Sequence, residues 1–287
     1  MSLSYSSVRR DPPCYHTFSN SNPDTGSNPG AQAGSLKGGF KALKLKVIDS
    51  RGNEITNLEQ WSRTVRRSHW KPGRSAYSLA DFIMSRHGTA HLDARISSVL
   101  SRAVTLEQGT PEYAARFDRY EGPARLDLGI SGRTACGDNL FVGLEAKVDE
   151  PFGSETVCER WRKATDTLRT KPRSRAAARV RELLSRYFDD DDEPCESGFA
   201  DVGYQLLTAT AGAVAMEADA SVLYVAVFRT LDYDEERSRK NRLDYDNFMR
   251  VSGGESLVQD GSGFLAHELT LNGRRLVCIY EYLGLEN

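Results

Sequence analysis

The sequence lacks the long apolar segments that mark membrane and secreted proteins. No run approaches the roughly 18 consecutive apolar residues of a membrane helix, and the longest apolar stretch, 222–228, has the length of a strand. No apolar segment of the signal-peptide type follows Arg9 and Arg10 near the N-terminus. We therefore expect a cytoplasmic protein that does not contact a membrane.

Cysteine is scarce and carries no motif. The chain has five cysteines, with no CxxC pair among them. The odd count and the wide spacing argue against a disulfide framework and against a structural zinc site. We expect reduced and mostly buried thiols at these positions, which are Cys14, Cys136, Cys158, Cys195 and Cys278.

Other common site motifs are missing as well. The chain has no phosphate-binding loop of the Walker A or G-x-G-x-x-G type. His87 and His91 are four residues apart, but Gly88 follows His87 where a zinc protease carries glutamate. We therefore predict neither a nucleotide-binding loop nor a zinc-protease site.

The charges nearly balance in number but are unevenly spread. The chain has 38 basic and 40 acidic residues, yet ten basic residues between positions 160 and 186 face only Asp166 and Glu182. That segment carries +8 and the rest of the chain −10. A local field of this strength allows a polyanionic partner despite the small net charge. The alternative is a solvated helical face.

The chain is predicted to consist of a disordered tail, 1–38, and a single folded domain, 39–287. The stretch 19–39 is mostly Ser, Asn, Pro and Gly and offers almost nothing to bury. In the domain, the Asn272-Gly273 pair predicts a C-terminal β-hairpin over 264–283. Apolar periodicity predicts helices at 57–67, 78–87, 91–102, 154–167, 174–187 and 201–216, and strands at 43–47, 103–107, 124–130, 140–148 and 221–228.

Two of these strands, joined by a polar link, place three charged side chains together. Glu145 and Lys147 are two residues apart, so both side chains leave a strand on one face. Opposed residues in an antiparallel hairpin have a constant index sum. Pairing Asp127 with Glu145 centres the turn on Cys136, inside the polar link 131–139. The hairpin is therefore predicted to gather Asp127, Glu145 and Lys147.

The aliphatic residues of both strands agree with this register. In the first strand, Leu126, Leu128 and Ile130 are expected on the face opposite Asp127. In the second strand, the even-numbered aliphatic residues from 140 to 148 are expected on the face opposite Glu145. The charged residues therefore share the less apolar face, unless a bulge in the link shifts the pairing.

Two carboxylates beside an amine indicate metal-dependent chemistry. Paired carboxylates repel each other unless a cation lies between them, and hard oxygen ligands suit Mg²⁺ or Mn²⁺. Such an ion lowers the pKa of bound water and neutralises charge that develops on a phosphate. A neighbouring lysine can hold the attacking water. The alternative is a salt bridge between Glu145 and Lys147 at a strand edge, which contributes little stability.

The segment RLDLGISG followed by FVGLEAKVDEPFG resembles motifs II and III of the PD-(D/E)XK nuclease superfamily. The helices that follow and the strand SVLYVAVF resemble the later part of the αβββαβ core of that superfamily. EAKVDEPFG with the later GYQLLTATAGAVAMEA also resembles an uncharacterised bacterial family placed there. The likeness covers about 75–228. It implies a restriction-endonuclease-like α/β fold, a mixed sheet flanked by helices, with the C-terminal hairpin as an addition.

The resemblance also implies roles for individual residues. Asp127 and Glu145 would bind Mg²⁺ or Mn²⁺ together with the backbone carbonyl of Ala146, and Lys147 would be the catalytic lysine. Some nucleases of the superfamily carry a helical glutamine that reaches the active centre. Gln205 is the matching candidate here, with capping or packing as its alternative role.

The superfamily also allows a further acidic residue from the preceding helices. Asp81, Glu107 and Glu112 are candidates, and the sequence does not choose among them. Alternation places Glu150 off the face of Glu145, unless the strand ends before it.

We therefore predict a Mg²⁺-dependent nuclease that hydrolyses phosphodiester bonds, with DNA as substrate; a repair, restriction or phage-defence role would fit. Alternatives are a catalytically inactive binding module of the same fold and a nuclease that acts on RNA. The sequence leaves open whether two copies form a homodimer. The arginine-rich segment is predicted to contact backbone phosphates through Arg160, Lys163, Arg173, Arg175 and Arg179.

Deleting residues 1–35 is expected to leave the thermal midpoint of unfolding nearly unchanged, because this segment has few apolar groups to bury. The measurement is thermal unfolding of the truncated and the full-length chain under identical conditions. A large drop in the midpoint would show that the tail packs on the domain.

Overall fold

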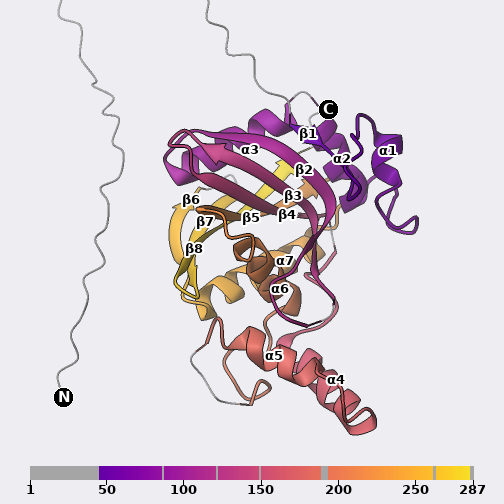
Figure 1. Ribbon diagram of the computed structural model, residues 1–287, viewed down its shortest axis with the longest axis vertical. Coiled ribbons are helices and arrows are strands. Elements are labelled where there is room, and N and C mark those ends of the chain that lie inside the picture. Colours follow the sequence, from indigo (N-terminus) through magenta and orange to yellow (C-terminus); the bar gives the residue numbers. More distant parts are fainter. Residues whose placement is uncertain are drawn as a thin grey trace, which may run out of the picture. The chain divides into compact units, whose positions relative to one another are not determined.

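The computed structural model describes residues 45–85, 87–120, 122–148, 150–188, 193–260 and 263–284. The predicted tail, 1–38, lies outside the described residues. The chain divides into two units, and all described residues belong to the second, Ala42–Asn287. Figure 1 shows this unit as a curved sheet with helices packed against it.

The described residues form an α/β structure, which confirms the predicted class. The helices are α1 (Leu58–Ser62), α2 (Ser75–Met84), α3 (Gly88–Leu100), α4 (Val157–Thr170), α5 (Ala176–Leu184), α6 (Tyr204–Val214) and α7 (Glu235–Val251). The strands are β1 (Lys46–Val47), β2 (Val104–Ala115), β3 (Ala124–Thr134), β4 (Asn139–Lys147), β5 (Ala220–Arg229), β6 (Glu255–Gln259), β7 (Phe264–Leu271) and β8 (Arg274–Gly284). No helix within these described ranges is both long enough and apolar enough to cross a membrane.

All eight described strands belong to one mixed sheet, in the order β1-β2-β3-β4-β5-β8-β7-β6. The pairs β2–β3, β3–β4, β6–β7 and β7–β8 are antiparallel, whereas β1–β2, β4–β5 and β5–β8 are parallel. The predicted C-terminal hairpin is present as β7–β8, with Asn272 and Gly273 at positive φ in its turn. Because β8 pairs with β5, this hairpin extends the main sheet.

Each face of the sheet carries its own hydrophobic core. Helices α1–α3 pack on one face, around Trp61, Leu92 and Ile96. Helices α4–α7 contribute to the core on the other face, around Leu207, Tyr245 and Phe248. Strand β5 is buried on both faces, as its continuous apolar run predicts. The two faces are hereafter called the α3 face and the α6 face.

The β3–β4 hairpin has the predicted register. Leu128 faces Leu144 and Arg133 faces Asn139, so the index sum is the expected one throughout the pairing. The turn closes around Cys136 through a hydrogen bond from Gly137 N to Thr134 O, 2.9 Å long.

The even-numbered residues of β4 lie in the core on the α3 face, which leaves Glu145 and Lys147 on the α6 face. The expected alternation of β3 is wrong at one position. Leu128 and Ile130 do lie in the core on the α3 face, but Leu126 belongs to the core on the α6 face. The paired strand is irregular at the same level, because Glu112 has a φ of +50°. A left-handed residue interrupts the regular pleat, and the side-chain alternation changes beside Asp127.

The expectation that the cysteines are unpaired thiols is wrong for two of them. Cys158, in the first turn of α4, forms a disulfide with Cys195, in the segment between α5 and α6. The backbone bonds Val157 N–Val202 O and Cys158 N–Ala200 O bring the two segments together nearby. Cys278 is buried as expected, whereas Cys136 is exposed. The disulfide therefore fastens the start of α4 to the chain that leads into α6.

Replacing Cys195 by serine is expected to lower the free energy of unfolding by about 2–4 kcal/mol. The disulfide closes a long loop and so restricts the conformations of the unfolded chain, and the substitution removes this restriction. The measurement is urea unfolding without reductant, with Cys136→Ser as the matched control. With dithiothreitol, wild type and Cys195→Ser should become equally stable. A loss of stability that is the same with and without dithiothreitol would argue against the disulfide.

Candidate active site

The two predicted carboxylates meet where β3 and β4 diverge. The last paired residues of the two strands are Leu128 and Leu144. One residue further along, Asp127 Oδ2 accepts a hydrogen bond from Ala146 N at 2.8 Å. The aspartate side chain therefore takes the backbone donor of β4 just beyond the paired region, which fixes its carboxylate beside Glu145.

Glu145, Lys147 and Gln205 form a connected network. Gln205 Nε2 donates to Glu145 Oε2 at 2.9 Å, and Lys147 Nζ donates to Gln205 Oε1 at 3.3 Å. Lys147 Nζ lies 3.7 Å from Glu145 Oε2, so the amide bridges the two charged groups. The ammonium group also lies 5.4 Å from the ring centre of Phe152. Glu145 and Lys147 are only 2% and 6% exposed, so little water screens their charges.

The chain between β4 and α6 brings Gln205 to the strands. Thr156 pairs with Gly203 in an isolated β-bridge, and Tyr204 N donates to Glu155 O at 3.0 Å. This places the first turn of α6 against the segment that follows β4. Gly153 has a φ of +74°, and a Cβ there would lie 3.3 Å from Gln205 Cβ. A side chain at position 153 would therefore be strained and would press on the glutamine.

Burial raises the pKa of both carboxyl groups. Burial and then the charge of Asp127 raise the pKa of Glu145 to about 8, while Lys147 opposes the shift. Burial also raises the pKa of Asp127, which Lys147 and the Ala146 N–H counteract. Glu145 Oε1 is buried and has no hydrogen-bond partner within the described chain. Glu145 Oε1 can therefore still accept a hydrogen bond or bind a cation.

Of the three further acidic candidates, Glu112 lies nearest to Asp127, although on a strand and not on a preceding helix. It lies on β2 between the pairs Pro111–Leu128 and Tyr113–Leu126, at the level of Asp127. Burial and the charge of Asp127 raise its pKa. The other two candidates lie elsewhere, since Glu107 forms an ion pair with Arg133 at 3.6 Å and Asp81 lines a hollow with Asn57 and Glu59.

Glu150 also borders the site, because β4 ends at Lys147 and alternation no longer governs its direction. Its carboxylate accepts hydrogen bonds from Val148 N at 2.7 Å and from Ser75 Oγ at 2.5 Å. Burial would raise the pKa of Glu150, but these two bonds lower it below its usual value. Its charge raises the pKa of Asp127. Asn241, on α7, donates to Glu150 O at 2.6 Å and holds the backbone there.

The predicted phosphate-binding residues differ in how firmly they are held. Arg160 lies over the ring of Tyr204 and pairs with Glu155 at 3.3 Å, and Lys163 pairs with the same carboxylate at 2.7 Å. Arg179 is bound to Asp118 at 2.7 Å and to the carbonyl of Gly122, so it is a structural residue as well as a cation.

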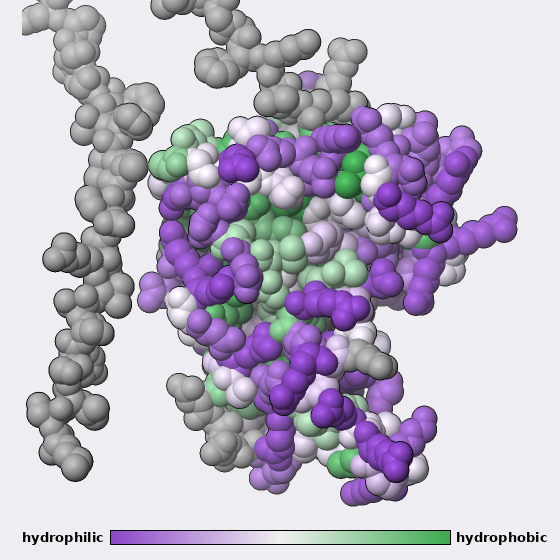
Figure 2. Space-filling view, in the orientation of Figure 1, coloured by the Kyte–Doolittle hydropathy of each residue, from purple (hydrophilic) through white to green (hydrophobic). Residues whose placement is uncertain are grey.

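Arg173 and Arg175 are exposed at the start of α5. Hydrophilic residues cover most of the surface over α4 and α5 in Figure 2. The +8 segment therefore presents its charge beside α6, the helix that carries Gln205.

The donors of the site suit a hard divalent cation. Asp127 and Glu145 offer carboxylate oxygens, and a cation would relieve both their repulsion and the unpaired Glu145 Oε1. No three acidic, histidine or cysteine side chains converge into a complete coordination set among the described residues. The protein would therefore supply part of the coordination shell, as is usual for Mg²⁺.

A family described as a domain of unknown function (DUF6946) matches residues 54–280, so the chain belongs to this family. The matched region contains both strands of the β3–β4 hairpin, the +8 segment and Gln205. Neither a search of curated proteins nor a search of solved structures found a match.

Replacing Glu145 by glutamine is expected to stabilise the metal-free protein at pH 8. The pKa of this group is raised to about 8 in the folded state, so folding favours its protonated form. The stability that protonated Glu145 adds to the folded state is therefore fully present below the ordinary pKa of 4.5 and is lost as the pH rises toward 8. The loss is at most about 1.4 kcal/mol per pH unit.

The measurement is urea unfolding in EDTA between pH 5 and pH 8. Wild-type stability should fall relative to Glu145→Gln across this range. Glu268→Gln, on β7, is the control and should follow the wild-type curve. Parallel wild-type and Glu145→Gln curves would contradict the raised pKa.

Proposed function

We propose that this protein is a Mg²⁺- or Mn²⁺-dependent nuclease that hydrolyses phosphodiester bonds in DNA. The observation that carries the proposal is the bridged network of Glu145, Gln205 and Lys147 beside the half-buried carboxylate of Asp127. The order α3-β2-β3-β4-α6-β5, with α4 and α5 inserted between β4 and α6, supports it, because it follows the αβββαβ order of a restriction-endonuclease-like core. The four strands of that order are neighbours in the sheet.

In this proposal, Asp127 and Glu145, with the backbone carbonyl of Ala146, hold the metal ion. A bound ion would supply a water of lowered pKa and would neutralise charge on the phosphate. Glu145 Oε1 is the oxygen best suited to bind the ion, since it is buried and lacks a hydrogen-bond partner within the described chain. Glu112 and Glu150 lie further out and add negative charge that favours cation binding.

Lys147 is the catalytic lysine of the proposal, and Gln205 is its positioning residue. Lys147 Nζ is held between Gln205 Oε1 and Glu145 Oε2, in a site with little bulk water. An ammonium group in such a place orients the attacking water and stabilises negative charge in the transition state. Gln205 fixes both Glu145 and Lys147, so its loss should disturb both the metal ligand and the lysine.

The cations around α4 and α5 would hold the nucleic acid by its phosphates. Arg160 and Arg179 line the same hollow as Gln205, so charge is available immediately beside the proposed catalytic groups. Arg173 and Arg175 extend this charge away from the site. Because Arg179 also anchors Asp118, substitutions at Arg173 and Arg175 separate phosphate binding from folding more cleanly.

Lys147→Ala should abolish cleavage and preserve DNA affinity. Loss of one transition-state donor lowers the rate by about 10²–10³-fold or more, whereas both metal carboxylates remain. The assay incubates the full-length chain with supercoiled plasmid, circular single-stranded DNA and RNA, in Mg²⁺, Mn²⁺ or EDTA. Lys46→Ala, an exposed lysine on β1, is the matched control.

The proposal requires that cleavage depends on a divalent ion and disappears with Lys147. Substrate binding without any cleavage in Mg²⁺ or Mn²⁺ would instead support a catalytically inactive binding module. Cleavage of RNA alone would keep the chemistry and change the substrate. Metal-dependent cleavage that Lys147→Ala leaves intact would refute the assigned site.

A further inference from the structure

Three hollows share lining residues with one another, from the start of α5 to Arg186 just after its end, and together they are called the α5 track. The first, of about 530 Å³, includes Tyr120, Arg160 and Arg179, and the second, of about 330 Å³, shares both arginines. The third, of about 360 Å³, shares Phe117 with the second. The middle hollow also includes Gln205. The track therefore passes the proposed catalytic network and extends beyond it in two directions.

Arginines and aromatic rings alternate along the track. Arg175 and Arg179 are four residues apart and share one side of α5, and Arg186 follows two residues after the helix ends. Arg175 lies 5.9 Å from the ring centre of Tyr120, and Arg179 and Arg186 lie 5.1 and 5.8 Å from that of Phe117. Phe117 is only 5% exposed and supports the two arginines from below, so the planar guanidinium groups and the half-buried ring of Tyr120 are the surfaces on which unpaired bases could stack.

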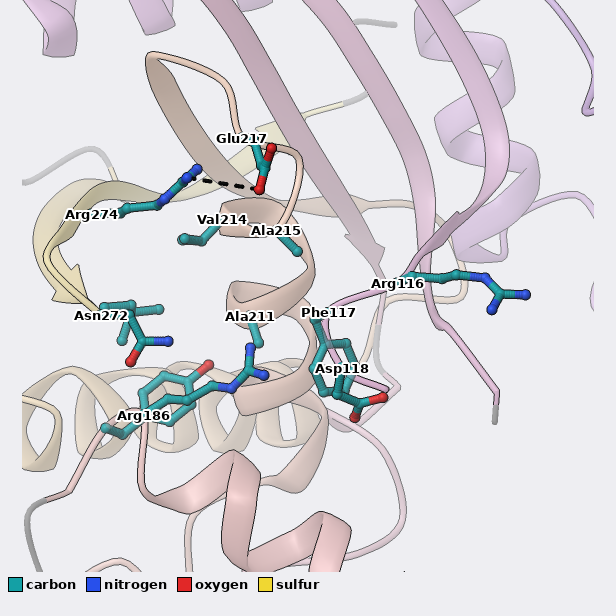
Figure 3. A pocket seen from close by; sticks show the side chains of 12 residues that line it. Arg116, Phe117, Asp118, Arg186, Ala211, Val214, Ala215, Glu217, Asn272 and Arg274 are labelled. Atoms are coloured by element: carbon teal, nitrogen blue, oxygen red, sulfur yellow. Dashed lines mark ion pairs between the residues drawn. The ribbon is translucent and has the colours of Figure 1, made fainter. Parts of the chain in front are cut away.

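Arg186, at the far end of the track, has a long ion pair with Glu182 as its anionic contact within the described chain. Its side chain is only 21% exposed, and the nearest carboxylate oxygen in the described chain, Glu182 Oε1, lies 3.8 Å away. The other oxygen of Glu182 is engaged by Arg119 at 3.0 Å and by the Tyr120 hydroxyl at 3.1 Å. Figure 3 shows the guanidinium of Arg186 reaching into the hollow toward Ala211. A mostly buried guanidinium whose ion pair is this long can still donate hydrogen bonds to a further anion.

We propose that the α5 track binds an unpaired nucleic-acid strand, with Arg186 as a phosphate contact on one side of the catalytic network and Arg173 on the other. This inference rests on the proposed function. Gln205 and Ala211 are six residues apart on α6, or ~9 Å along its axis. At the stacked spacing of ~3.4 Å per phosphate, about three nucleotides span that length. The hollows have the size of small-molecule sites, which suits single nucleotides placed one after another.

The test measures binding in EDTA, so that it does not depend on cleavage. Fluorescence anisotropy of the full-length chain is recorded with a 12-nucleotide oligo-dT and with a blunt 12-base-pair duplex, over a range of salt. The single strand should bind about tenfold more tightly, because only unpaired bases stack on the track. Arg186→Gln and Arg173→Gln should each lower the salt slope by about 0.7, the value for one phosphate contact to a single strand.

Arg162→Gln is the matched control, since Arg162 is exposed on α4 in the same +8 segment and lines none of the three hollows. Its salt slope should equal that of wild type. Arg186→Lys keeps the charge and should retain the slope, which separates a lost phosphate contact from misfolding.

Equal slopes for Arg162→Gln and Arg186→Gln, tighter binding of the duplex, or no binding of the single strand would each overturn the track. Metal-dependent cleavage of DNA in the same preparation would then leave the proposed nuclease function intact. Single-strand binding with the expected slopes, but without cleavage in Mg²⁺ or Mn²⁺, would support the track and refute the nuclease function.

Discussion

The repulsion between the buried carboxylate of Glu145 and the half-buried carboxylate of Asp127 is the constraint on which the rest of this structure depends. Asp127 and Glu145 are brought together by the β3–β4 register, and burial keeps water from screening their charges. Lys147 and the hydrogen bonds from Ala146 N and Gln205 offset part of the repulsion between the two carboxylates. The remaining negative charge, increased by nearby carboxylates, is the reason that we infer a cation site.

The surrounding fold supplies the parts that this site needs. The divergence of β3 and β4 frees Ala146 N for Asp127, and the bridge between Thr156 and Gly203 seats the first turn of α6 so that Gln205 reaches both charged partners. The disulfide fastens the same two segments. Arg179, on the basic side of α5, lines the same hollow as Gln205. Local rigidity around the network and positive charge beside it therefore arise from the same stretch of chain.

The sequence predicted the features that follow from periodicity, because strand alternation and a constant index sum hold wherever pairing is regular. This gave the hairpin register and the shared face of Glu145 and Lys147. It could not reveal irregular geometry: the left-handed φ of Glu112 and the change of face at Leu126 depend on the local bend of two strands. The disulfide joins residues 37 positions apart, which only the packed loops bring together. Helix α7 and strand β6 were not predicted. The sequence of α7 is mostly polar, and its few buried residues do not form a clear apolar period.

The most direct test of the central claim is the number of protons released when the site binds a divalent ion. Isothermal titration with Mn²⁺ at pH 7, repeated in buffers of different ionisation enthalpy, measures binding and proton release together. Because the pKa of Glu145 is raised to about 8, we expect wild type to release close to one proton per ion. Glu145→Gln should bind the ion weakly and release almost none. Equal binding and proton release by both proteins, or no binding by wild type up to about 10 mM, would contradict the claim that these carboxylates form a cation site.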